Sequence, residues 1–459
     1  MIQALLDYYR LPDDCFKGPH ASGIPAASQQ GFFRFGAENI CYGRSQGGVA
    51  PDVAGSGQFD ASNYDRGNQS SGQLPFDFDD VIANLRLERY RQNMIPENNT
   101  VAASPAVRKI YYFVRAILPV AIRRHLQKEY FRGWKKLPFP AWPVDFTVDN
   151  LHEEVLRRSM VAQGIEKVPF IWFWPDGAPN VVMMTHDIET AAGRDFTFKL
   201  MDIDDSYGFK ASYQVIPEER YAVPDEYVRQ IRARGCEFNV HDLTHDGQLY
   251  QKREIFLQRA KKINEYLKKF GARGFRAGGM YRNVDWFDAY EFSYDMSVPN
   301  VAHLEPQRGG CCTVMPFFIG NIVELPLTTT QDYSLFHILN DHSIDLWKTQ
   351  LELIRQRNGL MSFITHPDYL INRGNRKVYE SLLAYLRQMI DRENIVAALP
   401  GDVDRWWRAR SQMKLIPSKD GWEITGPGSE RARVAYAVLT GDQLMYEIDG
   451  CPMRKTLAR

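Results

Sequence analysis

The sequence carries no excess charge of either sign. Its 56 Lys and Arg side chains are matched by 56 Asp and Glu side chains, so the formal net charge at pH 7 is zero. A protein whose main partner is nucleic acid needs an excess of basic side chains to neutralise phosphates. The charge balance therefore argues against nucleic acid as the main partner.

Cysteines and long apolar runs are also scarce. Only six cysteines occur in 459 residues and none forms a CxxC pair, so we expect reduced thiols in a reducing compartment. No stretch approaches the roughly 20 apolar residues that span a bilayer. The first residues, MIQALLDYYRLPDD, lack the basic and apolar regions of a signal peptide. Together these absences predict a cytoplasmic protein.

The length and the changes in composition predict several domains. Residues 1–100 form an N-terminal region that is partly loop or disordered, because 45–73 is rich in Gly, Ser and Asn. Within it, GFFRFGAENICYG favours a small hairpin and 77–94 has helical spacing of apolar residues. The other predicted units are a basic helical segment with a Pro-rich linker (101–150), a catalytic domain (151–412) and a small β appendage (413–459).

Residues 105–136 hold nine Lys or Arg against one Glu, interleaved with large apolar side chains. One interpretation is a helical hairpin that packs on the catalytic domain and turns its basic face to solvent. The other is a surface that contacts anionic lipid, as basic amphipathic helices do. The second interpretation would make the protein membrane-peripheral.

From residue 181 onward, short apolar strands alternate with amphipathic helices. The strands include VVMMTHD, KASYQVI, CEFNVHD and MSFITHP, and helices are expected at about 252–270, 344–358 and 376–391. This rhythm predicts an α/β fold built on an incomplete (β/α) barrel of about seven strands, with an α-rich N-terminal region. Active sites of such barrels lie at the C-terminal ends of the strands, so the residues there are the candidates.

The first candidates follow the strand VVMMT. Asp187 and Glu189 are two positions apart, so both can face one pocket. The repulsion between two close carboxylates is relieved by a cation or by a proton on one of them. Surface carboxylates at a helix start would show the same spacing, so this pair alone is weak evidence.

The second candidates are His241 and His245, which follow the strand CEFNV in an HxxxH pattern. One helical turn would place both imidazoles on one face, where they can share a metal ion. Asp242 and Asp246 are candidates for orienting the rings. A polar loop with no ligand is the alternative.

Two further strand ends carry single candidates. Arg276 ends the strand of GFRAGG and could hold a carboxylate through a bidentate fork. Gly278 and Gly279 would allow a ligand to approach the backbone closely. His366 ends the strand MSFIT, where a lone histidine is more often structural unless other catalytic groups join it.

Taken together, these motifs resemble the polysaccharide deacetylases with a NodB-type catalytic domain, which are carbohydrate esterase family 4. The likeness covers about 175–400 and consists of THDIE (185–189), HDLTH (241–245), FRAGG (275–279) and ITH (364–366). Three departures are visible. Ile188 replaces the second Asp of the first motif, the proline after the arginine is missing, and no DxxDW motif is found. The residue that supports the catalytic histidine is therefore open, with Asp295 and Asp332 as candidates.

The resemblance implies a metal-dependent hydrolysis of an N-acetyl group on an amino sugar or glycan. The implied metal is a divalent ion, with zinc as the leading candidate. Its implied ligands are Glu189, His241 and His245, with Asp187 as an alternative ligand. The implied catalytic residues are Asp187 as base, Arg276 as its positioning partner and His366 as acid. The implied substrate-binding residues are Gly278, Gly279 and Tyr281.

The resemblance leaves two other functions open. Similar domains hydrolyse small or cyclic amides, and a degraded site would leave a sugar-binding relic without activity. The segments LPLTTTQDYSLF and HPDYL suggest a branch connected with surface-polysaccharide synthesis. The expected partner is a glycan or amino-sugar substrate, and the oligomeric state cannot be read from the sequence.

Overall fold

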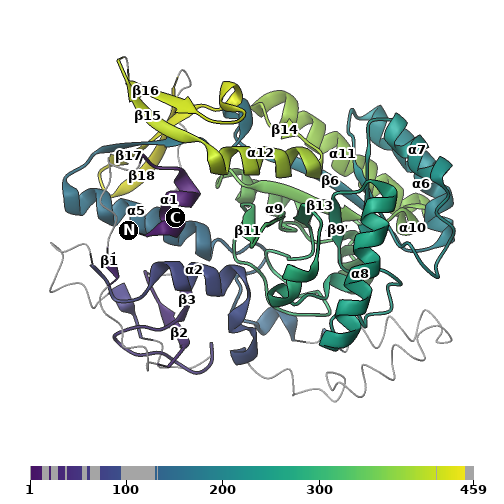
Figure 1. Cartoon of the computed structure of the whole chain (residues 1–459), viewed down its shortest axis with the longest axis horizontal. Helices are drawn as coiled ribbons and strands as arrows, with labels where there is room; N and C mark the ends of the chain where they lie inside the picture. Colours follow the sequence, from purple (N-terminus) through teal and green to yellow (C-terminus); the bar gives the residue numbers. More distant parts are fainter. Residues whose placement is uncertain are drawn as a thin grey trace.

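The computed structural model of the chain describes residues 2–12, 20–21, 29–36, 39–53, 59–62, 73–94, 130–131, 133–419 and 421–449. The predicted basic segment, 105–136, lies almost wholly outside these residues. The described part consists of a barrel-like sheet surrounded by helices and a second lobe beside it, which holds the smaller sheets (Figure 1). The domain boundaries proposed from the sequence stay a prediction.

A curled nine-stranded sheet forms the centre of the larger lobe. Its order is β11–β12–β10–β9–β8–β7–β6–β13, and β14 adds to β6. The strands are β6 (Val181–Ile188), β7 (Ser212–Val215), β8 (Glu237–His241), β9 (Gly274–Arg276), β10 (Tyr294–Asp295), β11 (Phe317–Ile319), β12 (Ile322–Glu324), β13 (Leu360–Thr365) and β14 (Val396–Ala397). All of its pairs are parallel except β11 with β12. The predicted α/β fold with an incomplete barrel is confirmed.

Threonine hydroxyls join the two sides where the barrel stays open. The chain after β12 runs beside β13, and no backbone ladder links β12 to β13 in the described sheet. Instead, Thr328 Oγ1 donates to the Leu360 carbonyl and Thr329 Oγ1 donates to the Ser362 carbonyl, both at 2.7 Å. The Ser362 amide in turn donates to Thr328 Oγ1 at 2.9 Å. The run of threonines thus satisfies backbone groups that a closed barrel would pair with each other.

Helices cover the outer face of this sheet, as parallel strands require. They are α6 (Ala191–Ser206), α7 (Asp225–Ala233), α8 (Arg253–Phe270), α9 (Asp345–Arg355), α10 (Pro367–Leu370), α11 (Arg373–Glu393) and α12 (Pro400–Gln412). Buried side chains such as Leu200, Phe256 and Leu382 fill the layer between helices and strands. Helix α8 ends at Gly271, which takes the left-handed angle φ 58° that favours glycine at a helix C-terminus.

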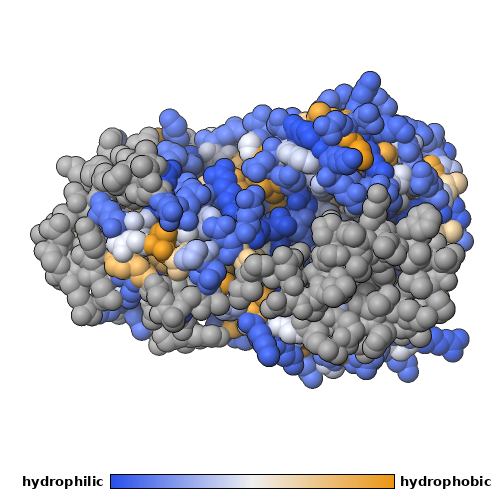
Figure 2. Space-filling model, turned by 90° about the horizontal axis from the view of Figure 1, so that it is seen from below, coloured by the Kyte–Doolittle hydropathy of each residue, from blue (hydrophilic) through white to orange (hydrophobic). Residues whose placement is uncertain are grey.

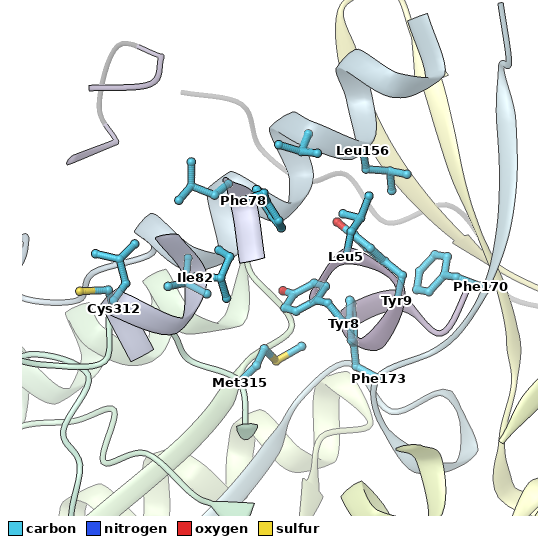
Figure 3. Close-up of a cluster of buried hydrophobic side chains, with 14 of the residues drawn as sticks. Leu5, Tyr8, Tyr9, Phe78, Ile82, Leu156, Phe170, Phe173, Cys312 and Met315 are labelled. Carbon is cyan, nitrogen blue, oxygen red and sulfur yellow. The ribbon is translucent and has the colours of Figure 1, made fainter. Parts of the chain in front are cut away.

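The second lobe brings together residues from both ends of the described sequence. Strand β17 (Val434–Thr440) pairs with β18 (Gln443–Ile448) and with β5 (Lys167–Ile171). These late strands therefore form one sheet with β5, a strand that comes before all the barrel strands in the sequence. Helices α1 (Gln3–Tyr9), α2 (Phe78–Arg86) and α5 (Thr147–Gln163) pack with this sheet. The hydroxyls of Tyr9 and Tyr446 lie 2.7 Å apart. Figure 3 shows the apolar cluster where α1, α2 and α5 meet.

Several smaller elements match their predictions. The expected hairpin is β2 (Gly31–Arg34) paired with β3 (Ile40–Gly43), and the expected helix over 77–94 is α2 followed by a 3₁₀ turn at Arg89–Asn93. Strands β15 (Lys414–Ser418) and β16 (Gly421–Thr425) form a second hairpin. Within the described residues, Cys41, Cys236, Cys311 and Cys312 are buried free thiols.

Few large apolar side chains are exposed among the described residues, namely Val161, Leu257, Phe318, Ile371 and Ile416. Among them, no helix combines the length and the apolarity that crossing a bilayer requires. Figure 2 shows one face, where hydrophilic residues predominate and the hydrophobic ones form small separate patches within the coloured area. This face offers no broad apolar contact surface in its coloured part.

Candidate metal centre

Strand β6 delivers two carboxylates to the inside of the barrel. Side chains alternate along a strand, so Asp187 and Glu189 share one face and His186 takes the other. Asp187 accepts a hydrogen bond from Arg276 at 2.7 Å, whereas His186 contacts Asp204 of α6 at 3.0 Å on the outer side. The two-residue spacing therefore aims both acids at the barrel mouth and leaves His186 in a structural network.

His241 and His245 converge through a loop, not through a helical turn. His241 ends β8, and the residues from His241 to His245 form no helix. Asp242 and His245 take left-handed backbone angles of φ 57° and 55°. The expectation that one helical turn brings the rings together is therefore wrong. The two ring centroids nevertheless lie 4.9 Å apart.

The glycines after Arg276 make room for this loop. A Cβ added at Gly278 would come within 2.5 Å of Asp242 Oδ2 and within 2.8 Å of His245 Cδ2. Gly279 has φ 62°, which favours glycine. Tyr281 is buried two residues later. Gly278 thus packs against the histidine loop, while substrate binding by Gly278, Gly279 and Tyr281 stays a prediction.

Glu189, His241 and His245 form a group that could hold a metal ion. One ligand atom from each lies within 4.8 Å of the others, and His245 Nε2 is 3.0 Å from Glu189 Oε1. The Arg276 carbonyl accepts a hydrogen bond from His241 Nδ1 at 3.1 Å, which fixes the tautomer and leaves the Nε2 lone pair facing the cluster. That Nε2 is buried and has no hydrogen-bond partner in the described structure. Two imidazoles and a carboxylate are a typical catalytic zinc donor set, so these residues fit a divalent metal.

The charges around the two acids keep both ionised. Burial would raise the pKa of Asp187, but Arg276, His241 and His366 together hold it below its ordinary value. Burial would likewise raise the pKa of Glu189, and His245 and His366 hold it well below that value. Arg276 donates to Asp187 through one nitrogen only, Nη1, and its Nε donates to the backbone carbonyl of Met296. The predicted bidentate fork is therefore not formed. Asp187 Oδ2 remains directed at His241 Nε2, 3.8 Å away.

The partner of His366 is Asp332. His366 Nδ1 donates to Asp332 Oδ1 at 2.6 Å, and the His366 backbone amide donates to Oδ2 at 2.8 Å. His366 Nε2 lies 3.6 Å from Glu189 Oε1, so the ring faces the cluster. Burial alone would lower the pKa of His366, but Asp332 and Glu189 raise it well above its ordinary value. The chain thus places a charged imidazole beside the candidate metal ligands.

The other carboxylates considered from the sequence have different partners. Asp295 lies beside Glu324 on the neighbouring strand and accepts hydrogen bonds from Ser297, so it does not support His366. Asp246 forms an ion pair with Arg259 at 2.6 Å. Asp242 accepts a hydrogen bond from the following amide, that of Leu243. The His241 ring is oriented by the Arg276 carbonyl instead.

Asp368 is a functional candidate that the sequence did not single out. Its carboxylate accepts hydrogen bonds from the Thr190 hydroxyl and from the Glu189 amide, the latter at 3.4 Å. A Cβ on Gly193 would collide with it at 2.3 Å. Helix α10 thereby supports the backbone that carries Glu189. The only signal in the sequence is its position two residues after His366.

Comparison with known proteins gives matches in structure alone. No family model and no curated protein matches the chain. Similar solved structures include a Mycobacterium smegmatis protein assigned as a polysaccharide deacetylase (18% identity, 52% of this chain, 93% of that chain, TM-score 0.42). A family 4 carbohydrate esterase from Streptomyces lividans in complex with acetate matches at 12% identity, 48% of this chain, 92% of that chain and TM-score 0.31. A CE4 family pseudoenzyme from Bacillus anthracis matches at 11% identity, 50% of this chain, 66% of that chain and TM-score 0.30.

These structures belong to the group that the motifs resemble, and each match covers about half of the chain. One of them is described as an esterase and another as a pseudoenzyme. At these TM-scores the matches carry no conclusion about activity, which depends on the side chains of the site.

Proposed function

We propose that this protein is a metal-dependent hydrolase that cleaves an N-acetyl amide on an amino sugar or glycan and releases acetate. One observation carries the proposal. Three groups with separate chemical tasks converge at the strand ends: the Glu189–His241–His245 cluster, the Asp187–Arg276 pair and the His366–Asp332 pair. A site that had only a structural role would not need all three.

The two pairs supply a base and an acid at the same pH. Asp187 is ionised, its Oδ1 is held by Arg276, and its Oδ2 is available to take a proton from an attacking water. His366 is protonated, donates through Nδ1 to Asp332 and presents Nε2 to the cluster. When the surroundings of two titratable groups move their pKa values apart, one group can act as the base and the other as the acid at the same pH.

This division of roles suits amide hydrolysis. An amide nitrogen leaves poorly unless it receives a proton, and the His366 Nε2 proton can serve there. A divalent ion held by Glu189, His241 and His245 would act as a Lewis acid toward the amide carbonyl. The Glu189 side chain keeps 22% of its surface exposed, more than the other groups of the cluster, so substrate would approach from that side. The assignment of a sugar as the substrate rests on the resemblance of the four sequence motifs and their order.

The proposal is tested by acetate release and metal content together. The purified protein is assayed on a panel of N-acetylated glycans with and without chelator, and its bound metal is measured. His245→Ala should lose both metal and activity, whereas His342→Ala should keep both, because His342 is exposed and lies outside the cluster. Full acetate release by the metal-free protein would contradict the scheme. Stoichiometric metal without acetate release from any glycan would favour the non-catalytic relic.

A further inference from the structure

A cavity lies between helices α1 and α2 of the second lobe and the barrel elements β11 and α12, and it shares no residue with the candidate metal centre. It has a volume of about 510 Å³ and is bounded by α1, α2, α12 and the chain around β11. Cavities that bind small molecules have volumes of roughly 300–1,000 Å³. The walls include Tyr8, Ile82, Phe317 and Trp407. Figure 3 shows Tyr8 of α1 and Ile82 of α2 at this junction.

Two guanidinium groups line this cavity without a carboxylate partner. Arg86 forms no ion pair within the described residues, its Nε is buried without a hydrogen-bond partner, and its guanidinium carbon lies 5.6 Å from the centroid of the Phe317 ring. Arg410 is 2% exposed, and its hydrogen bonds from Nε and Nη2 go to the carbonyls of Tyr8, Ile171 and Trp172. Buried cations without a counter-charge are costly, so proteins normally pair them.

The acids around the cavity are already engaged. Asp7 pairs with Arg10 at 3.1 Å, and Asp79 accepts the first backbone amides of α1, those of Gln3 and Ala4. Asp149, behind the wall, accepts from Thr313, Val314 and Tyr8, and burial raises its pKa to about 6. Burial also lowers the pKa of Arg86 and lowers that of Arg410 to about 9. The lining itself holds three arginines (Arg10, Arg86 and Arg410) against two aspartates (Asp7 and Asp79), so it carries one excess positive charge that an anion would balance.

We infer that this cavity is a binding site for a small organic anion whose carboxylate or phosphate head contacts Arg86 and Arg410 and whose flat apolar body lies against Tyr8, Phe317 and Trp407. Guanidinium groups bind planar oxyanions through charge-assisted hydrogen bonds. Aromatic walls favour a ligand with an apolar body over a bare anion. The site is independent of the proposed deacetylase function, because none of its residues reaches the metal ligands.

The test uses 2-naphthoate as the probe, with 2-naphthalenemethanol as the neutral analogue and inorganic phosphate as the bare anion. Binding is measured on the full chain by calorimetry and by the shift in melting temperature, which grows with ligand concentration when the folded state binds. Saturable binding of naphthoate is expected. Equal affinity for the neutral analogue would overturn the inference, as would failure of naphthoate to bind.

Variants separate the charge from the shape of the cavity. Arg86→Met should weaken naphthoate binding at least about 10-fold, because a charge-assisted hydrogen bond is lost. Arg229→Met is the matched control, since it removes an exposed arginine on α7. Ala83→Phe keeps both guanidinium groups but fills part of the cavity, so it should also abolish binding. Unchanged affinity in Ala83→Phe or Arg86→Met would refute the site. His241→Ala should bind the probe like the wild type, so a failed metal centre would not affect this result.

Discussion

The ion pair between Glu88 and Arg282 connects the second lobe to the loop that follows the FRAGG motif (275–279) of the barrel. Glu88 follows α2, and Arg282 follows Tyr281 on the barrel; their side chains are 2% and 0% exposed. Arg282 Nε donates to Glu88 Oε2 at 2.5 Å, and its Nη2 donates to Oε1. The Gly310 amide also donates to Oε1, at 2.6 Å. One buried carboxylate thus holds three donors from two separate barrel loops.

Replacing Glu88 by alanine should destabilise the protein strongly. Burial would lower the pKa of Arg282, and Glu88 is the main group that raises it, so the arginine would be left charged and buried without a partner. Removal of one member of a buried pair costs about 3–5 kcal/mol. Replacing both members by apolar residues of similar size, Glu88→Leu with Arg282→Met, should cost less than Glu88→Ala alone.

Urea unfolding followed by circular dichroism measures these changes. Glu226→Ala, which removes an exposed carboxylate paired with Arg229 on α7, is the control and should leave the midpoint almost unchanged. The reasoning is refuted if Glu88→Ala and Glu226→Ala shift the midpoint equally. It is also refuted if the double variant is less stable than Glu88→Ala, because the cost would then not come from an uncompensated charge.

Three more perturbations test other parts of the structure. Asp332→Asn should lower kcat at least about 100-fold with little change in KM. It should also move the alkaline limb of the pH profile to lower pH, because Asp332 raises the pKa of His366. An alkaline limb that stays in place would contradict this role. Burial raises the pKa of Glu237 from 4.5 in the unfolded chain to about 7 in the folded protein. The contribution of its protonated carboxyl to folding stability is therefore present below pH 4.5 and is lost as the pH rises from 4.5 to about 7. Glu237→Gln should therefore gain stability relative to wild type across the window in urea titrations, and a constant difference would refute the assignment. Thr329→Val should cost about 1–3 kcal/mol by leaving a β13 carbonyl unpaired at the barrel seam, whereas exposed Thr349→Val should cost much less in the same urea assay.

The sequence predicted the local parts of the site well. The two-residue period of a strand was enough to place Asp187 and Glu189 on one face, and it also explains why His186 points outward. The expected convergence of strand ends brought His241, His245 and the acids together. The helical turn between the histidines was wrong because two residues there take left-handed angles, which no periodicity indicates.

Contacts between distant segments could not be predicted in this way. Asp332 and His366 are 34 residues apart and meet only because the chain after β12 runs beside β13. An alternating pattern marks β17 as a strand but does not identify β5 as its partner. Likewise, nothing near Arg86 or Arg410 in the sequence indicates that both line one cavity.

The pairing of β17 with β5 has a consequence for biosynthesis. Strand β5 leaves the ribosome before any barrel strand, but its neighbour β17 follows all of them. Until β17 and β18 emerge, the edge of β5 that pairs with β17 is open, and Tyr9 of α1 lacks its hydroxyl partner Tyr446. Open strand edges beside exposed apolar side chains invite pairing with other chains. During synthesis, this lobe therefore keeps an unpaired strand edge until the last strands emerge.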